Sequence, residues 1–502
     1  MRRPRAAGPA QPQPAHALTL LPARPSPPHS PTHRVAALSA TGAAWWLGAS
    51  AAALGAAAVL LRLPFRSAPL TADEGGYAEL ARLWAHGEPL YRTVWVDRPQ
   101  GLLLVFRAAR GAGLTSTVAL RGVAAACAVV IAVSVVAIGK RSGSTWIAVA
   151  AGILAVTAGA SPFIEGFTLS GELIAGALAA VAIAVFLAGE RSGSLAALAC
   201  AGLVAGAAVT VKQSAFDAAL AVGAYILLTR GRAALAPAGV FLAGACLPLV
   251  AAYALSGDRH AWVQAVIGYG AHASIARSGA AGRFSHLATS LPAAAKALGP
   301  AAVLAAAGWS RAPLLLRLWV VAAFVGVGVG GGFHPHYYEQ LAAPLALVAA
   351  WGARRLGTWA VVAAVAVVLG FAAPFWPASA ARQASAFWPD DPHLRTDAAV
   401  ASYVKAHTRP GERIYVLWAA ADVYYLADRP PAYRYLWLRN VTTTAGGVAG
   451  ADRVLAGRQA ALVVEAQAPA VADPSGRTAA LLRREYRRVA RVHGVQIWRA
   501  VR

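Results

Sequence analysis

Long apolar runs, separated by short polar segments, make up most of this chain from residue 43 to residue 376. Runs of about 20 mainly apolar residues are typical of transmembrane helices. The runs lie near 43–62, 118–138, 145–163, 172–189, 195–211, 214–229, 235–254, 291–309, 315–333, 338–352 and 358–376. The pattern predicts a polytopic α-helical membrane protein with about eleven transmembrane helices.

The two ends of the chain lack such runs. Residues 1–35 are rich in proline and arginine and predict a disordered cytoplasmic tail. The run at 43–62 is too long for a signal peptide, so we expect a retained span. Residues 377–502 predict a small soluble α/β domain, which leaves 36–376 as the membrane domain. Within the soluble domain we expect helices at 397–406 and 478–489 and strands at 414–418, 461–465 and 495–498.

Composition and charge support a membrane protein and orient it. Hydrophobic residues make up 58% of the chain and charged residues 13%, which excludes a wholly soluble protein. The net charge of +24 does not indicate a nucleic-acid partner, because no soluble segment combines a basic stripe with interleaved aromatic residues. Basic residues instead recur in alternate loops, which predicts a cytoplasmic N-terminus and an outer C-terminal domain. These loop residues are Lys140, Arg141, Arg191, Arg230, Arg232, Arg311, Arg317, Arg354 and Arg355.

The first outer loop, about 63–117, holds the adjacent carboxylates Asp73 and Glu74 directly after the first predicted span. A pair of acids at the membrane surface suits a general base or a metal ligand. Thr71 and Glu74 also have the spacing of a capping box, which is an equally good explanation of Glu74. Beyond them, Tyr77, Leu80 and Trp84 recur at helical spacing and predict a helix lying flat at the membrane interface.

Further candidates lie in the outer turns. Arg98 offers a guanidinium fork for phosphate, although contact with lipid head groups is the more common role. Glu172 begins an apolar run and either faces a polar cavity or reaches water. Lys212 lies in a tight outer turn, where it either neutralises a phosphate or snorkels. His336 and Tyr337 belong to a cluster that fits a substrate site as well as an interfacial belt.

The order of these motifs resembles the GT-C superfamily of integral-membrane glycosyltransferases. It runs from D-E-x-x-Y at residue 73, through D-R-P-x-G at residue 97 and the outer turn with Lys212, to H-Y-Y-x-Q-x-x-x-P at residue 336. The branch that looks most similar includes bacterial relatives of protein O-mannosyltransferases and lipid A aminoarabinose transferases. The tail from Thr408 to Trp437 also resembles the extracytoplasmic cap of that branch.

The resemblance implies transfer of a sugar from a polyprenyl-phosphate donor to an acceptor at the outer face of the membrane. It implies that Asp73 is the general base, that Glu74 is its partner or a metal ligand, and that Glu172 is the second-loop acid, which is usually aspartate in the family. It also implies that the donor phosphate meets Arg98, where the family often has lysine. The remaining donor-phosphate candidates are Lys212, His336 and Tyr337.

Two other classes remain open at this stage. A multi-span permease is the main alternative, although transporters usually carry charged residues near the membrane midplane. A non-catalytic scaffold is the other. The expected partners of a transferase are a polyprenyl-phosphate-linked sugar, membrane lipids and a lipid, glycan or protein acceptor, with no nucleic acid. The expected location is the bacterial cytoplasmic membrane, and a divalent metal is possible because paired carboxylates suit either chemistry.

Overall fold

The computed structural model describes residues 31–276 and 280–501. The chain divides into a small unit, residues 1–48, and a large unit, residues 49–502. The described part of the small unit is the first portion of helix α1 (Pro31–Leu60). The predicted disordered tail lies outside the described residues up to residue 30, but the prediction is wrong for residues 31–35. Pro31 fits the first turn of a helix, and no proline follows it in α1.

Each of the eleven predicted spans contains a helix. After α1 they are α4 (Thr117–Ser142), α5 (Thr145–Gly159), α6 (Gly171–Ser192), α7 (Leu195–Val211), α8 (Asp217–Arg230), α9 (Leu235–Ala254), α12 (Ala280–Gly308), α13 (Leu314–Val329), α14 (Ala342–Leu356) and α15 (Thr358–Ala372). Among the described residues, six helical segments are long and apolar enough to cross a membrane. The number of crossings therefore stays a prediction.

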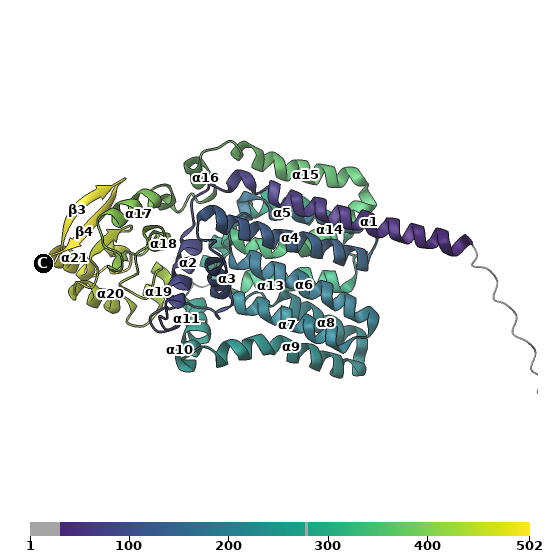
Figure 1. Cartoon of the computed structure of the whole chain (residues 1–502), viewed down its shortest axis with the longest axis horizontal. Coiled ribbons are helices and arrows are strands. Elements are labelled where there is room, and N and C mark those ends of the chain that lie inside the picture. Colours follow the sequence, from purple (N-terminus) through teal and green to yellow (C-terminus); the bar gives the residue numbers. More distant parts are fainter. Residues whose placement is uncertain (1–30, 277–279, 502) are drawn as a thin grey trace, which may run out of the picture. The chain divides into compact units, whose positions relative to one another are not determined.

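The long helices of the large unit run side by side (Figure 1). Helix α7 packs between α6 and α9, while α14 packs against α12 and α5. Small residues permit the closest approaches. A Cβ on Gly206 would lie 2.0 Å from the carbonyl oxygen of Ala245 in α9, and one on Gly352 would lie 1.9 Å from that of Leu304 in α12. Close packing of small residues is the usual way in which helices associate in membranes.

Short elements connect the long helices. They are η1 (Leu63–Phe65), α2 (Ala72–Ala85), α3 (Gly101–Gly111), η2 (Pro162–Ile164), η3 (Gly231–Ala234), α10 (Arg259–Val263), η4 (Gln264–Gly268), α11 (Tyr269–Ala276), η5 (Pro335–Leu341) and η6 (Ala373–Phe375). Helix α2 is the predicted interface helix, but Tyr77 and Leu80 are buried in protein. Tyr77 packs on Phe106 of α3 and on Trp437 of the C-terminal segment, residues 377–501, so protein side chains cover the stripe, and the position of α2 at the membrane interface stays a prediction.

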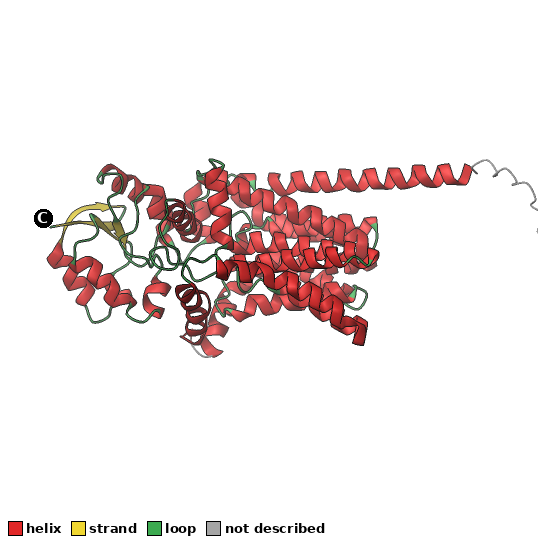
Figure 2. Cartoon of the chain, turned by 60° about the horizontal axis from the view of Figure 1, so that its bottom comes forward, coloured by secondary structure: helices red, strands yellow, loops and turns green. Residues whose placement is uncertain are grey.

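The C-terminal segment contains α16 (Ala380–Phe387), η7 (Pro392–Arg395), α17 (Asp397–Ala406), α18 (Asp422–Ala427), α19 (Leu438–Thr443), α20 (Gly447–Ala456), η8 (Pro469–Val471) and α21 (Arg477–Glu485). Its strands are β1 (Ile414–Val416), β2 (Leu462–Glu465), β3 (Tyr486–Val492) and β4 (Val495–Ala500). They form one sheet in the order β1-β2-β4-β3, and these strands lie together at one end of the large unit (Figure 2).

The sheet is mixed. Strand β1 pairs parallel to β2 with Ile414 opposite Leu462, and β4 pairs antiparallel to both β2 and β3. The expected helix at 478–489 was wrong at its end, because the chain turns into β3 after Glu485. A tight turn at His493 and Gly494, both with positive φ, brings β4 back along β3, so the two strands hydrogen-bond to each other.

The C-terminal segment and the loop at 63–117 share one hydrophobic core. That core includes Leu80 of α2, Phe106 of α3, Tyr415 of β1 and Ile497 of β4. The loop at 63–117 is therefore held between the long helices and the C-terminal segment, and this fixes the position of Asp73.

Candidate active site

The first turn of α2 is built by a capping box. The Thr71 hydroxyl accepts a hydrogen bond from the Glu74 amide at 3.1 Å, and the Glu74 carboxylate accepts one from the Thr71 amide at 3.2 Å. The same carboxylate forms a buried ion pair with Arg121 of α4 and accepts a hydrogen bond from the Leu169 amide at 2.7 Å. Both carboxylate oxygens of Glu74 are thus bound by protein, and its position serves the structure of the loop.

Asp73 lies one residue earlier, and its side chain is exposed. Desolvation raises the pKa of Asp73, while the positive charges of His336 and Arg98 oppose the increase. The negative charges of Glu172 and Glu165 add to it. Three of these neighbours, His336, Arg98 and Glu172, are candidates from the sequence that the fold brings together from distant positions.

Glu172 and Lys212 form one buried ion pair of this cluster. Glu172 is in the first turn of α6, where the Ser170 hydroxyl caps the helix by accepting from the Leu173 amide at 3.0 Å. Lys212 is the residue at which α7 ends. The two helices pack against each other, which places the carboxylate and the ammonium group at the same end of the bundle. Glu172 is only 4% exposed, so it faces protein groups rather than open water.

The short helix η5 supplies His336 and Tyr337. The Nδ1 atom of His336 lies 3.3 Å from the carboxylate of Glu165, and its Nε2 atom lies 3.6 Å from that of Glu172. Burial lowers the pKa of His336, but the nearby Glu172, Glu165 and Asp73 outweigh it and raise the pKa to about 10. The imidazole is therefore a cation at neutral pH.

Tyr337 and Arg98 complete the group of predicted residues. The Lys212 ammonium group lies 3.6 Å from the centre of the Tyr337 ring, which is a close cation–π contact. The Arg98 guanidinium lies 4.8 Å from the centre of the Tyr77 ring and forms a 3.2 Å ion pair with Asp97. Burial lowers the pKa of Arg98, but its acidic neighbours and Tyr77 raise it overall, so the side chain stays charged.

Two contacts hold the segment with Arg98 against the segment with Lys212. Gln213, beside Lys212, donates a 2.6 Å hydrogen bond to the carbonyl oxygen of Asp97. A Cβ on Gly101 would lie 2.3 Å from the Thr210 hydroxyl, so glycine permits the close approach of α3 to the end of α7. The two segments that carry Arg98 and Lys212 therefore form one rigid border of the site.

Sequence analysis assigned no role to several residues of this site. Glu165 was visible as an outer-loop acid, but nothing in the sequence indicated that it faces His336, 171 positions away. Arg121 offered a usable signal, because a charge inside an apolar run usually has a partner. Glu339 was seen only as part of the histidine and tyrosine cluster, and it accepts a 3.1 Å hydrogen bond from the Ser170 hydroxyl.

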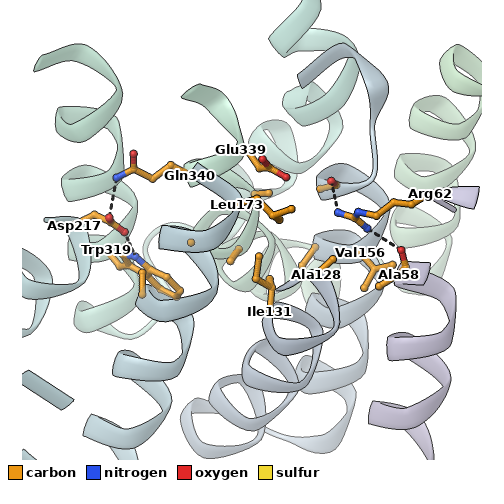
Figure 3. A pocket seen from close by; sticks show the side chains of 16 residues that line it. Ala58, Arg62, Ala128, Ile131, Val156, Leu173, Asp217, Trp319, Glu339 and Gln340 are labelled. Carbon is orange, nitrogen blue, oxygen red and sulfur yellow. Dashed lines mark hydrogen bonds between the residues drawn. The ribbon is translucent and has the colours of Figure 1, made fainter. Parts of the chain in front are cut away.

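A small cavity lies among the helices, and Glu339 is one of the residues that line it (Figure 3). Asp217 borders it on one side, where its carboxylate accepts hydrogen bonds from Trp319 at 2.6 Å and Gln340 at 2.7 Å. Arg62 borders it on the other side and donates to the carbonyl oxygens of Gly159 and Gly166. The space open to the centre of a water molecule is about 20 Å³, which is room for about one water.

Within residues 31–276 and 280–501, no group of three or more His, Cys, Asp and Glu side chains is arranged to hold a metal ion. The metal requirement that the paired carboxylates suggested stays an open prediction. The chemistry that the arrangement itself offers is an exposed carboxylate, Asp73, near the cations His336 and Arg98, while Glu172 holds a third cation, Lys212, and also faces His336. Such a site suits proton abstraction next to a bound phosphate.

No protein-family profile and no curated protein matches this sequence. Solved structures do match its fold. ArnT from Cupriavidus metallidurans bound to undecaprenyl phosphate superposes with a TM-score of 0.63 and 16% identity, over 92% of this chain and 98% of that one. Its apo state gives a TM-score of 0.60 over the same shares of the chains, again at 16% identity.

A second structure is more distant. The oligosaccharyltransferase AglB from Archaeoglobus fulgidus, in complex with an inhibitory peptide and a dolichol-phosphate, matches with a TM-score of 0.51 and 13% identity, over 84% of this chain and 69% of that one. The chain therefore shares its fold with these structures, and its described residues include six helical segments that are long and apolar enough to cross a membrane.

Proposed function

We propose that this protein is a glycosyltransferase that moves a sugar from a polyprenyl-phosphate donor to an acceptor of the cell envelope, at the outer face of the bacterial cytoplasmic membrane. The observation that carries the proposal is the position of Asp73, an exposed carboxylate whose charged neighbours include His336 and Arg98. The shared fold with ArnT, which was solved with undecaprenyl phosphate, supports a lipid-phosphate substrate.

In the proposed reaction, a hydroxyl or amine of the acceptor attacks the anomeric carbon of the donor sugar. The bond from that carbon to the phosphate oxygen breaks, and the electron pair leaves with the polyprenyl phosphate. Asp73 takes the proton of the acceptor, a contribution typically worth about 10²–10⁴ in rate. Arg98, Lys212 and His336 offset the negative charge of the leaving phosphate.

In the proposed function, carboxylates hold the three cations in place before the donor binds. Lys212 is paired with Glu172, Arg98 with Asp97 and His336 with Glu165, so each positive charge has a fixed place. Donors that are fixed in advance need no reorganisation when charge develops on the phosphate. In this proposal Glu172 is a charge partner of Lys212 and His336 rather than a second base.

The experiment is transfer by the purified full-length protein in vesicles that contain a polyprenyl-phosphate-linked sugar and an envelope extract. The transferred sugar is detected on the acceptor by mass spectrometry. We expect Asp73→Asn to abolish transfer and Asp258→Asn to retain it, because Asp258 caps α10 and pairs with Arg92 outside this cluster. Full transfer by Asp73→Asn would contradict the proposal.

A permease, the alternative from the sequence, receives no support from the cavity in Figure 3. A space with room for about one water is too small for a solute. The same vesicles distinguish the two functions, since uptake of labelled sugar without any transferred product would favour the permease.

The proposed orientation is tested separately. Ser402 of α17 and Ser192 at the end of α6 are both exposed and lie at positions assigned to opposite faces of the membrane. We expect a membrane-impermeant maleimide to label Ser402→Cys in intact cells and to label Ser192→Cys only after lysis. The opposite pattern would place Asp73 in the cytoplasm and overturn the proposal.

A further inference from the structure

Glu165 is held in a backbone conformation that is rare for its residue type. Its φ of 57° lies in the left-handed region, where a side chain is unfavourable and where strained residues often mark functional sites. Its amide donates to the Pro162 carbonyl at 3.1 Å, and its own carbonyl accepts from the Thr168 amide and hydroxyl, each at 2.9 Å. Hydrogen bonds on both sides therefore maintain the conformation.

The loop around Glu165 is clamped from two further directions. Arg62 donates to the Gly166 carbonyl at 2.7 Å and to the Gly159 carbonyl at 2.6 Å. The Leu169 amide donates to the carboxylate of Glu74 at 2.7 Å. A Cβ on Gly166 would lie 2.0 Å from the Gly159 carbonyl oxygen, so the loop closes tightly on itself. From this clamped loop the Glu165 side chain reaches η5, where its carboxylate contacts His336.

In that direction lies His336, whose two ring nitrogens face two different carboxylates. Glu165 contacts Nδ1 at 3.3 Å and Glu172 faces Nε2 at 3.6 Å. The ring of His334 also lies nearly parallel to that of His336, with 5.7 Å between ring centres. The hydrogen bond at Nδ1 therefore decides which way Nε2 points.

We propose that Glu165 is a positioning residue that keeps His336 protonated and holds its ring so that Nε2–H points toward Glu172, within the group of side chains proposed to bind the donor phosphate. The inference rests on the proposed function for its phosphate, and it adds a residue that no sequence motif marked. Glu165 acts only through His336 and touches neither the sugar nor the acceptor. Glu165 is only 8% exposed, so its contact with His336 is little screened by water.

Several charged or titratable groups lie around the imidazole, and acids and cations among them act on its protonation in opposite directions. They are Glu165 beside η2, Glu172 of α6, Asp73 of α2, Lys212 at the end of α7, Arg98 before α3, and Glu339 and His334 in the segment that carries His336. The carboxylates of Glu172, Glu165 and Asp73 together overcome the effect of burial and raise the pKa of His336. Removing one of the three charges should lower that pKa while the other two remain.

The test compares Glu165→Gln, which keeps the side-chain shape, with Glu88→Gln, which changes an outer-face acid that pairs with Arg413. Exchange of the imidazole C2 proton for deuterium, followed for the peptide with His336 by mass spectrometry, gives the pKa of this histidine. We expect Glu165→Gln to lower it by about 1 unit or more. The exposed His86 serves as the internal reference and should not change in either variant.

Transfer assays add a second readout. In Glu165→Gln we expect a higher KM for the lipid-phosphate donor. We also expect the alkaline limit of activity to shift to a lower pH, because His336 would lose its proton earlier. Glu165→Asp should partly reverse both changes. A merely structural role of Glu165 would leave the pH profile unchanged. An unchanged pKa of His336 overturns the proposal whether or not the protein transfers sugar, so its failure is distinct from a failure of the proposed function.

Discussion

Gly75 of α2 and Asp422 of α18 are in direct backbone contact. A Cβ on Gly75 would lie 2.4 Å from both the Cα and the Cβ atom of Asp422. This contact joins the helix that begins beside Asp73 to the C-terminal segment. The position of the proposed base therefore depends on residues that lie more than 300 positions away in the sequence.

The first prediction follows from this contact. Gly75→Ala should force α2 away from α18, and overpacking of this kind typically costs about 1–3 kcal/mol. We expect a lower melting temperature of the purified protein and reduced transfer. Gly111→Ala is the matched control, since a Cβ there meets no atom within 4 Å. Equal melting temperatures of the two variants would contradict the contact.

Sequence reasoning grouped the candidate residues better than it predicted which of them form ion pairs. Asp73, Glu172, Lys212 and His336 could be grouped because topology puts the ends of their helices on one face. The ion pair of Glu74 with Arg121 could not be predicted, because it joins residues 47 positions apart and local sequence offered a capping box as a complete explanation. The capping box is present, and the ion pair adds to it.

The environment of α2 was the part of the fold that the sequence could not decide. The spacing of Tyr77 and Leu80 predicts a buried stripe but does not tell what covers it. Lipid tails and the apolar side chains of a folded segment offer similar surroundings to such a stripe. In the structure Trp437 covers Tyr77, while Trp84 lies beneath the Arg107 guanidinium at 4.6 Å.

The second prediction concerns the buried ion pair of Glu74 and Arg121. Glu74→Gln should leave Arg121 charged and without its partner in a buried place, which typically costs about 3–5 kcal/mol. We expect a strongly lowered melting temperature. The double variant Glu74→Gln, Arg121→Met should recover part of this loss, because it removes the unpaired charge. If the double variant lost more stability than the two single variants together, the result would argue against the ion pair.

The third prediction is the acid limit of transfer. Desolvation raises the pKa of Asp73 above its ordinary value, against the opposing charges of His336 and Arg98. A base is active only when deprotonated, so activity should fall as the pH decreases, starting at a higher pH than the ordinary aspartate value of about 4. The rate measured from pH 4 to pH 8 at saturating donor tests this. A rate that is constant down to pH 4 would exclude Asp73 as the base.

The fourth prediction concerns two acids of the C-terminal segment. Asp397 and Asp422 are buried, and each has a carboxylate oxygen that finds no hydrogen-bonding partner among the described residues. Burial raises the pKa of Asp397, with a further contribution from Asp391, and burial also raises that of Asp422, with a contribution from Asp397. The folded state thus binds protons more tightly than the unfolded chain.

Stability should therefore decrease as the pH rises above about 4, the ordinary value of an aspartate. We expect the melting temperature to be lower at pH 8 than at pH 5. Asp397→Asn should reduce this difference, because the amide carries no charge at either pH. The exposed Asp390 provides the control, and Asp390→Asn should leave the pH dependence as it is in the unaltered protein.

The fifth prediction separates the ring of Tyr337 from its hydroxyl. The ring lies 3.6 Å below the Lys212 ammonium and helps to hold it at the site. Tyr337→Phe keeps the ring, so the KM for the donor should stay close to that of the unaltered protein. Tyr337→Ala removes a contact worth about 0.5–2 kcal/mol, which corresponds to an increase in KM of about 2- to 30-fold. If the phenylalanine variant were impaired as much as the alanine variant, the hydroxyl of Tyr337 and not its ring would be the group that the donor requires.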